Sequence, residues 1–93
     1  MFYRIRNTSV IIDVRDKQEH LSSSKNIIDK TINIPLNKLK KDIKKLHLKT
    51  NAEIYTFCES GKRSKVANML SKQMGYTNVH DLVSAQDVEF FLK

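Results

Sequence analysis

The sequence predicts an α/β domain with a mostly parallel sheet and helices on both of its faces. Short apolar and β-branched runs alternate with segments whose apolar residues recur at helical spacing, which is typical of parallel β-α-β architectures. With 93 residues, 40% of them apolar and 29% charged, the chain has the size and composition of one globular domain. We therefore expect a single domain over residues 1–93.

The first predicted elements are a buried strand and a short helix. Residues 10–14 form an apolar run that suits a strand buried on both faces. Asp16 and Glu19 have the spacing of a capping box, which predicts a brief helical turn that ends at the serines of residues 22–24. Residues 32–36 predict a second strand, with a proline near its end.

A lysine-rich helix is expected after the second strand, with Asn37 as its cap. Its apolar stripe consists of Leu36, Leu39, Ile43 and Leu46. Its polar side carries Lys38, Lys40, Lys41, Lys44, Lys45 and Lys49. The formal net charge is +7, but no aromatic residues are interleaved with these lysines. We expect a solvated lysine face, with nucleic-acid binding as a minor alternative.

The second half of the chain predicts two more strands and two more helices. Residues 54–57 are β-branched and aromatic, as in a strand. Residues 64–74 carry apolar side chains at helical spacing, and Gly75 stands where a helix C′ glycine belongs. Residues 76–82 predict the last strand, and residues 84–87 the capped start of the last helix.

Cys58, the only cysteine, is expected at the end of a strand, just before a loop and a helix N-terminus. Free backbone N–H groups at that place favour an anion such as a thiolate. Lys62 and Arg63 add positive charge, so we expect the pKa of Cys58 to be lowered. A single cysteine is more often a buried small hydrophobe. The polar residues that follow it favour a nucleophile instead, as does Gly61, which stands where a tight loop needs a positive φ.

Composition also limits the cofactors and compartments that we expect. One cysteine cannot form an internal disulfide, which suits a reducing compartment, and no apolar run approaches the length of a membrane span. We therefore expect a cytoplasmic protein without membrane contact. His20, His47 and His80 lack metal-ligand spacing with the cysteine, and we expect each at the surface or half-buried. No metal or organic cofactor is implied.

Four short motifs, in order, resemble the rhodanese family over nearly the whole chain from residue 10 onward. They are Asp13-Val14-Arg15 followed by Glu19, Asn33-Ile34-Pro35, the loop from Cys58 to Ser64, and Gly75-Tyr76 with Asn78-Val79. The resemblance implies a compact α/β domain that carries sulfane sulfur as a persulfide on the cysteine. The sulfur would come from thiosulfate or a persulfide and pass to cyanide, a thiol or a protein.

The resemblance places the chemistry in the loop. The expected persulfide-binding residues are Glu59, Ser60, Gly61, Lys62, Arg63 and Ser64. Their backbone N–H groups can surround the terminal sulfur of the persulfide. Arg63 is expected to contact the donor or to pair with a carboxylate, and Glu59 to point outward or to favour a cationic or protein donor. Asp13, Arg15 and Glu19 are expected to be structural, with Arg15 and Glu19 paired.

Other functions stay open at this point. Relatives with this fold act as phosphatases or arsenate reductases, but their loops place five residues between cysteine and arginine, and this chain has four between Cys58 and Arg63. A non-catalytic interaction module is a second alternative, against which the retained cysteine argues. A third is a sulfur-relay protein whose lysine face docks a protein partner.

Overall fold

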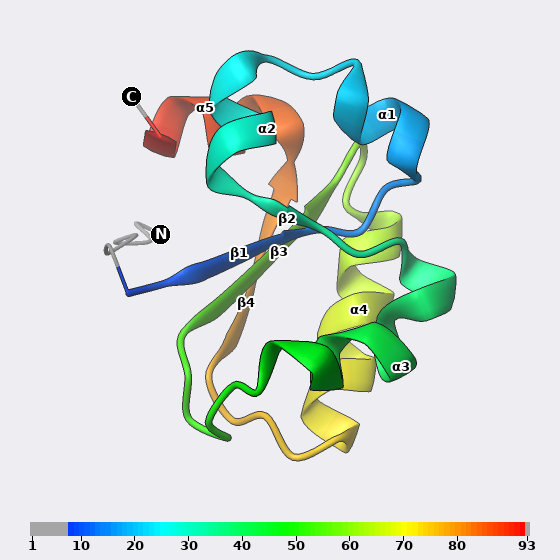
Figure 1. Ribbon diagram of the computed structural model, residues 1–93, viewed down its shortest axis with the longest axis vertical. Helices are drawn as coiled ribbons and strands as arrows, with labels where there is room; N and C mark the ends of the chain where they lie inside the picture. Colours follow the sequence, from blue (N-terminus) through cyan, green and yellow to red (C-terminus); the bar gives the residue numbers. More distant parts are fainter. Residues whose placement is uncertain (1–7, 93) are drawn as a thin grey trace.

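Within residues 8–92, which the computed structural model describes, four parallel strands form one sheet covered by helices on both faces (Figure 1). The strands are β1 (Val10–Asp13), β2 (Ile32–Asn33), β3 (Ile54–Cys58) and β4 (Val79–Ser84), in the spatial order β2-β1-β3-β4. The helices are α1 (Lys17–Leu21), α2 (Lys25–Lys30), α3 (Leu39–Asp42), α4 (Lys62–Gln73) and α5 (Ala85–Leu92), with the 3-10 turns η1 (Leu36–Lys38) and η2 (Ile43–Leu46) on either side of α3. The predicted fold class is confirmed.

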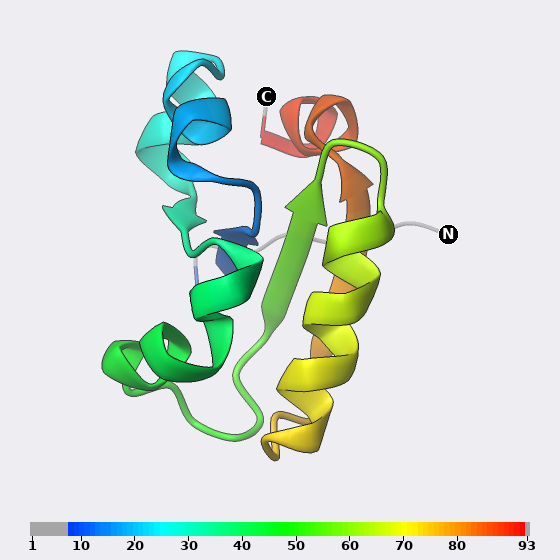
Figure 2. The ribbon, with the colours of Figure 1, turned by 90° about the vertical axis from the view of Figure 1, so that its right-hand side faces the viewer.

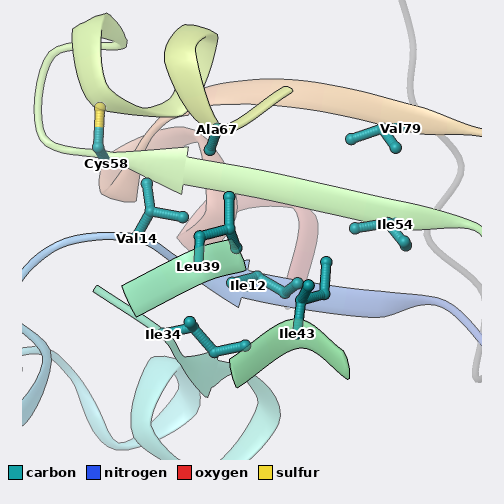
Figure 3. Packing of buried hydrophobic residues seen from close by; sticks show 9 residues of the cluster. All are labelled: Ile12, Val14, Ile34, Leu39, Ile43, Ile54, Cys58, Ala67 and Val79. Atoms are coloured by element: carbon teal, nitrogen blue, oxygen red, sulfur yellow. The ribbon is translucent and has the colours of Figure 1, made fainter. Parts of the chain in front are cut away.

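Alternating side chains of the central strands bury both faces of the sheet. On one face, shown in Figure 3, the strand residues pack against α3, η2 and α4; this cluster contains Ile12, Val14, Ile34, Leu39, Ile43, Ile54, Cys58, Ala67 and Val79. On the other face they pack against α2 and α5, in a cluster of Ile11, Ile27, Tyr55, Phe57, Leu82 and Val88. The double burial explains why β1 and β3 consist mostly of apolar residues.

The predicted capping signals are largely present. Asp16 and Glu19 form the expected capping box at α1. Gly75 has φ +101° after α4, and its N–H donates to the carbonyl of Lys72 at 3.0 Å. The Ser84 hydroxyl accepts from the N–H of Asp87 at 3.2 Å at the start of α5. These local interactions fix where three of the helices begin or end.

Several expected elements differ from the structure. The sequence reasoning missed α2, because Ser24 was interpreted as a break although its side chain caps that helix. β2 contains only two residues, and the last strand runs from Val79 to Ser84 instead of residues 76–82. Asn37 lies inside η1 and caps nothing, since neither η1 nor α3 has a side-chain cap. Val66, one of the apolar residues in the segment 64–74 that predicted this helix, is exposed, because α4 buries Ser64, Ala67 and Ser71.

The lysine segment follows its predicted pattern despite being split into α3 and two 3-10 turns. Leu39 and Ile43 are fully buried, and Leu36 and Leu46 pack against the same core cluster. All six lysines that were expected on the polar side are exposed. The expected amphipathic face is therefore confirmed.

The carboxyl ends of the strands meet at one edge of the sheet. Figure 2 shows β3 running into its loop and α4 at the upper end of the molecule, where α1 and α5 also lie. Parallel α/β sheets place their sites at this edge. None of the helices in residues 8–92 is long and apolar enough to cross a membrane. The predicted domain limits, residues 1–93, extend beyond the described residues at both ends and stay a prediction.

Candidate active site

Cys58 is the last residue of β3, and its sulfur points to the side of the sheet where α4 lies (Figure 3). Only 1% of the residue is exposed. The β3–β4 register shifts between Thr56, which pairs with Asp81, and Cys58, which pairs with Ser84. Gly61 then takes φ +91° and becomes the N-cap of α4, as the position of this glycine predicted.

The loop folds back so that its backbone N–H groups point at the sulfur. The N–H of Gly61 lies 2.9 Å from Sγ of Cys58, and the N–H of Ser64 lies 3.4 Å from it. These donors belong to the first turn of α4, where backbone N–H groups have no partner inside the helix. The loop therefore presents neutral, preorganised dipoles to an anion on this sulfur.

Burial raises the pKa of the Cys58 thiol, but hydrogen bonds lower it by more. The donors are the Ser64 hydroxyl and the backbone N–H groups of Ser64, Gly61 and Ser60, so the balance lies below the ordinary cysteine pKa. The predicted direction is confirmed. The part of the predicted cause that lies in the backbone N–H groups at the start of α4 is also confirmed, whereas the charges of Lys62 and Arg63 are not among the largest causes.

Arg63 forms an ion pair with Glu19 of α1. Its two terminal nitrogens, Nη1 and Nη2, lie 2.7 and 2.9 Å from the carboxylate oxygens of Glu19. Arg63 was expected either to contact the donor or to pair with a carboxylate, and the structure shows the pair with a carboxylate. The hydrogen bond with Arg63 is the main cause that lowers the pKa of Glu19 to about 2. Lys62 is exposed on the first turn of α4.

A buried charge cluster lies at the end of β1. Asp13 is fully buried and accepts hydrogen bonds from Nε and Nη2 of Arg15 at 3.0 and 2.9 Å. His20 Nδ1 lies 2.9 Å from the same carboxylate. The expected Arg15–Glu19 pair was wrong: Arg15 pairs with Asp13 and reaches Glu59 at 3.4 Å. The expectation of a surface or half-buried His20 was also wrong, because Asp13 provides a buried partner for its ring.

Glu59 and Ser60 form the exposed tip of the loop. The Glu59 side chain is 68% exposed, so it points outward. This was one of the two expectations for Glu59. An open cleft of about 380 Å³ lies beside this tip. Its lining includes Arg15, Glu59 and the start of α5 at Ala85.

The sequence reasoning missed Asp81 on β4. Its carboxylate oxygen Oδ1 accepts hydrogen bonds from the Ser64 hydroxyl at 2.6 Å and from the N–H of Val83 at 2.7 Å. The carbonyl of Val83 lies 3.8 Å from Sγ of Cys58. The signal in the sequence was weak, because a single acid in a strand has no motif partner nearby.

No metal centre is visible in the described part of the chain. Within residues 8–92, no three His, Cys, Asp or Glu side chains gather so that they could hold a metal ion. His47 is exposed and His80 is half-buried, as expected. The ring of His80 lies 2.6 Å from Oδ1 of Asn78 and stacks near Tyr55.

Comparisons with known proteins agree with this geometry. A family model described as the rhodanese-like domain matches residues 3–84. A rhodanese from E. coli, solved with anions, is 28% identical with a TM-score of 0.74, and the match covers 85% of this chain and 89% of that one. A human single-domain sulfurtransferase is 26% identical with a TM-score of 0.67, over 80% and 74% of the two chains.

A further relative is the proposed sulfur carrier protein YrkF of Bacillus subtilis (strain 168). It is 36% identical over 73 residues, which are 78% of this chain. This chain spans only 37% of the length of that protein.

Proposed function

Because the chain belongs to the rhodanese-like domain family, we propose that it is a sulfurtransferase that carries sulfane sulfur as a persulfide on Cys58. The observation that carries this proposal is the pair of loop N–H groups at 2.9 and 3.4 Å from Sγ of Cys58. Relatives named for sulfur carriage and sulfur transfer support it. Glu59, Ser60, Gly61, Lys62, Arg63 and Ser64 are the proposed binding loop, with Asp13, Arg15 and Glu19 as structural support.

The first half-reaction loads the sulfur. The Cys58 thiolate attacks the outer sulfur of thiosulfate or of a persulfide donor, and a new S–S bond forms. The S–S bond of the donor breaks, and sulfite or a thiolate leaves with the electron pair. The new terminal sulfur carries a negative charge, and the backbone N–H groups of the loop stabilise it without a side-chain base.

The second half-reaction unloads the sulfur. A nucleophilic acceptor, which can be cyanide, a thiol or a protein thiol, attacks the terminal sulfur and takes it away. The Cys58 thiolate leaves with the electron pair of the broken bond, which restores the starting enzyme. No second cysteine exists in the chain to discharge the persulfide from within, so it persists until an acceptor arrives. A free thiol of this kind suits a reducing compartment such as the cytoplasm.

Intact-mass spectrometry after incubation with thiosulfate, and separately with a persulfide donor, tests the proposal. We expect Cys58 to gain one sulfur atom, and cyanide to remove it as thiocyanate. Cys58→Ser is the control and should gain none while keeping its circular dichroism spectrum. Equal thiocyanate formation by the two proteins would disprove the assignment of the nucleophile.

A phosphatase assay separates the main alternative. We expect negligible hydrolysis of an aryl phosphate, because the short loop places its N–H groups close around one sulfur atom. If the protein hydrolysed an aryl phosphate in a Cys58-dependent manner as fast as it transferred sulfur, the phosphatase function would take first place.

A further inference from the structure

The Ser64 hydroxyl lies between the reactive sulfur and the Asp81 carboxylate. It has one proton and two neighbouring acceptors, Oδ1 of Asp81 at 2.6 Å and the carbonyl of Gly61 at 3.2 Å. Sγ of Cys58 lies 3.5 Å away and donates its S–H to the hydroxyl oxygen, so it becomes a third acceptor only when the thiol ionises. Ser64 itself is fully buried, so water does not compete for this proton. The nearest acceptor is also an anion, and hydrogen bonds to charged acceptors are the stronger ones.

We propose that Asp81 is a positioning residue that holds the hydroxyl proton of Ser64 away from Cys58. With that proton on the Asp81 side, a lone pair of the Ser64 oxygen faces the sulfur and accepts the S–H of the resting thiol. When Cys58 ionises, Ser64 either keeps its bond to Asp81 or turns toward the sulfur. Asp81 favours the first arrangement, so the backbone N–H groups are the constant donors to the sulfur anion, and the Ser64 hydroxyl joins them only when it turns toward the sulfur.

Asp81 also fixes the segment that covers the loop. Its Oδ1 accepts from the N–H of Val83, a β-branched residue at φ +70°, where such residues are strained. Val83 lies directly over Gly61: a Cβ built on Gly61 would approach Val83 Cγ1 to 2.9 Å. One carboxylate therefore holds both the hydroxyl beside the sulfur and the turn above the loop. A useful variant must keep an acceptor for Val83.

The charge of Arg63 also acts near this pair. Arg63 interacts with the Cys58 thiolate, which contributes to a raised pKa of Arg63, but its guanidinium is bound to Glu19. The hydroxyl of Ser64 lowers the pKa of Cys58 only while its proton points to the sulfur. Releasing Ser64 from Asp81 should therefore increase the thiolate fraction. The functional meaning rests on the proposed role of Cys58, but the ionisation can be measured without any sulfur donor.

A double-mutant cycle tests the proposal through the rate of iodoacetamide alkylation against pH. The four proteins are the wild type, Ser64→Ala, Asp81→Asn and the double variant. Asp81→Asn keeps a side-chain oxygen for the N–H of Val83 and removes the negative charge. We expect it to lower the alkylation midpoint of Cys58 by about one pH unit when Ser64 is present, and by clearly less when residue 64 is alanine.

Ser64→Ala alone gives a second, independent outcome. Because Asp81 already holds the hydroxyl proton away, we expect this variant to shift the midpoint by less than about half a unit. A rise of about a full unit would overturn the proposal, since Ser64 would then be serving the thiolate in the presence of Asp81. The midpoint of Ser64→Ala tests the proposal even if Asp81→Asn does not fold.

The matched control is Asp87→Asn. Asp87 also pairs with a serine, Ser84, at 3.0 Å between Oγ and Oδ2, but at the start of α5. We expect no change of the midpoint in this control. Equal shifts by Asp81→Asn with and without Ser64 would mean that Asp81 acts through charge alone, and a rise of the midpoint would contradict its restraining role. Either result overturns the proposal, whatever the sulfur-transfer assays show.

Discussion

The loop around Cys58 and the charged frame beside it, which consists of Asp13, Arg15, Glu19 and Arg63, are held together by different interactions. In the loop, neutral backbone N–H groups at 2.9 and 3.4 Å surround the sulfur. In the frame, full charges neutralise one another, as in the bonds of Asp13 with Arg15 and of Glu19 with Arg63. The formal charges thus fix the outside of the site, and dipoles face the reacting atom.

Under the proposed function, in which the Cys58 sulfur is loaded and unloaded, this division is suitable. A fixed cation bound directly to the sulfur would stabilise the persulfide but also hold it against the acceptor. Oriented N–H dipoles stabilise the charge without reorganising during the reaction. Because charges hold the frame and dipoles face the sulfur, we expect variants of the frame to change stability and variants of the loop to change sulfur transfer.

Removing Asp13 should have the largest effect. Asp13→Ala leaves Arg15, a buried guanidinium, without its main partner, and we expect the free energy of unfolding to fall by about 3–5 kcal/mol. Urea denaturation measures this loss. In the folded fraction, the alkylation midpoint of Cys58 should stay within about half a unit of the wild type.

Asp42→Ala provides the control for that measurement. Asp42 pairs with Lys45 at 3.3 Å at the surface, so its removal should cost at most about 1 kcal/mol. A loss as small for Asp13 as for Asp42 would show that the frame does not stabilise the fold.

The two glycines with positive φ test the loop. Gly61 and Gly75 have φ of +91° and +101°, so an alanine at either should lose about 1 kcal/mol of stability. An added Cβ would lie 2.9 Å from Val83 Cγ1 at Gly61, whereas at Gly75 it would have no neighbour within 4 Å. We expect Gly61→Ala to lower the rate of thiocyanate formation about tenfold or more, and Gly75→Ala to leave it unchanged.

Urea denaturation of both glycine variants belongs in the same experiment, because it separates loss of the loop geometry from loss of the fold. Equal rates of thiocyanate formation in the two variants would contradict a loop whose shape decides the chemistry.

Local sequence patterns predicted the parts of the site that depend on neighbours in the chain. The strand before Cys58, the positive φ of Gly61 and the capping box of Asp16 with Glu19 were all predicted from short spacings. These features rest on residue type within a few positions. The same local reasoning missed α2, because a serine can end one helical turn and cap the next.

The pairings across the fold could not be predicted in the same way. Arg63 binds Glu19 from 44 positions away, and Ser64 binds Asp81 from 17 positions away. Only the sheet order, which places α1 and β4 on either side of the loop, brings these groups together. Sequence spacing favoured the neighbouring Arg15 as the partner of Glu19, but Asp13 is closer to Arg15 in the folded chain.

The smallest effect on stability should come from a change of Glu19. The pH dependence of this effect tests whether the frame stabilises the fold through its charges. The pKa of Glu19 is lowered to about 2, chiefly by the hydrogen bond with Arg63. The carboxylate therefore stabilises the folded state at pH values where Glu19 is ionised in both the folded and the unfolded chain. We expect the wild type to exceed Glu19→Gln by at most about 1 kcal/mol near neutral pH, because solvent screens this half-exposed pair. The advantage should shrink as the pH falls from the ordinary glutamate value of 4.5 toward about 2. Urea denaturation at several pH values measures this advantage, and an advantage that grew in acid would contradict the ion pair.

Because the Glu19 charge faces Arg63 and not the sulfur, the alkylation midpoint of Cys58 should be the same in the wild type and in Glu19→Gln. A large shift would mean that the frame, too, sets the chemistry of the loop.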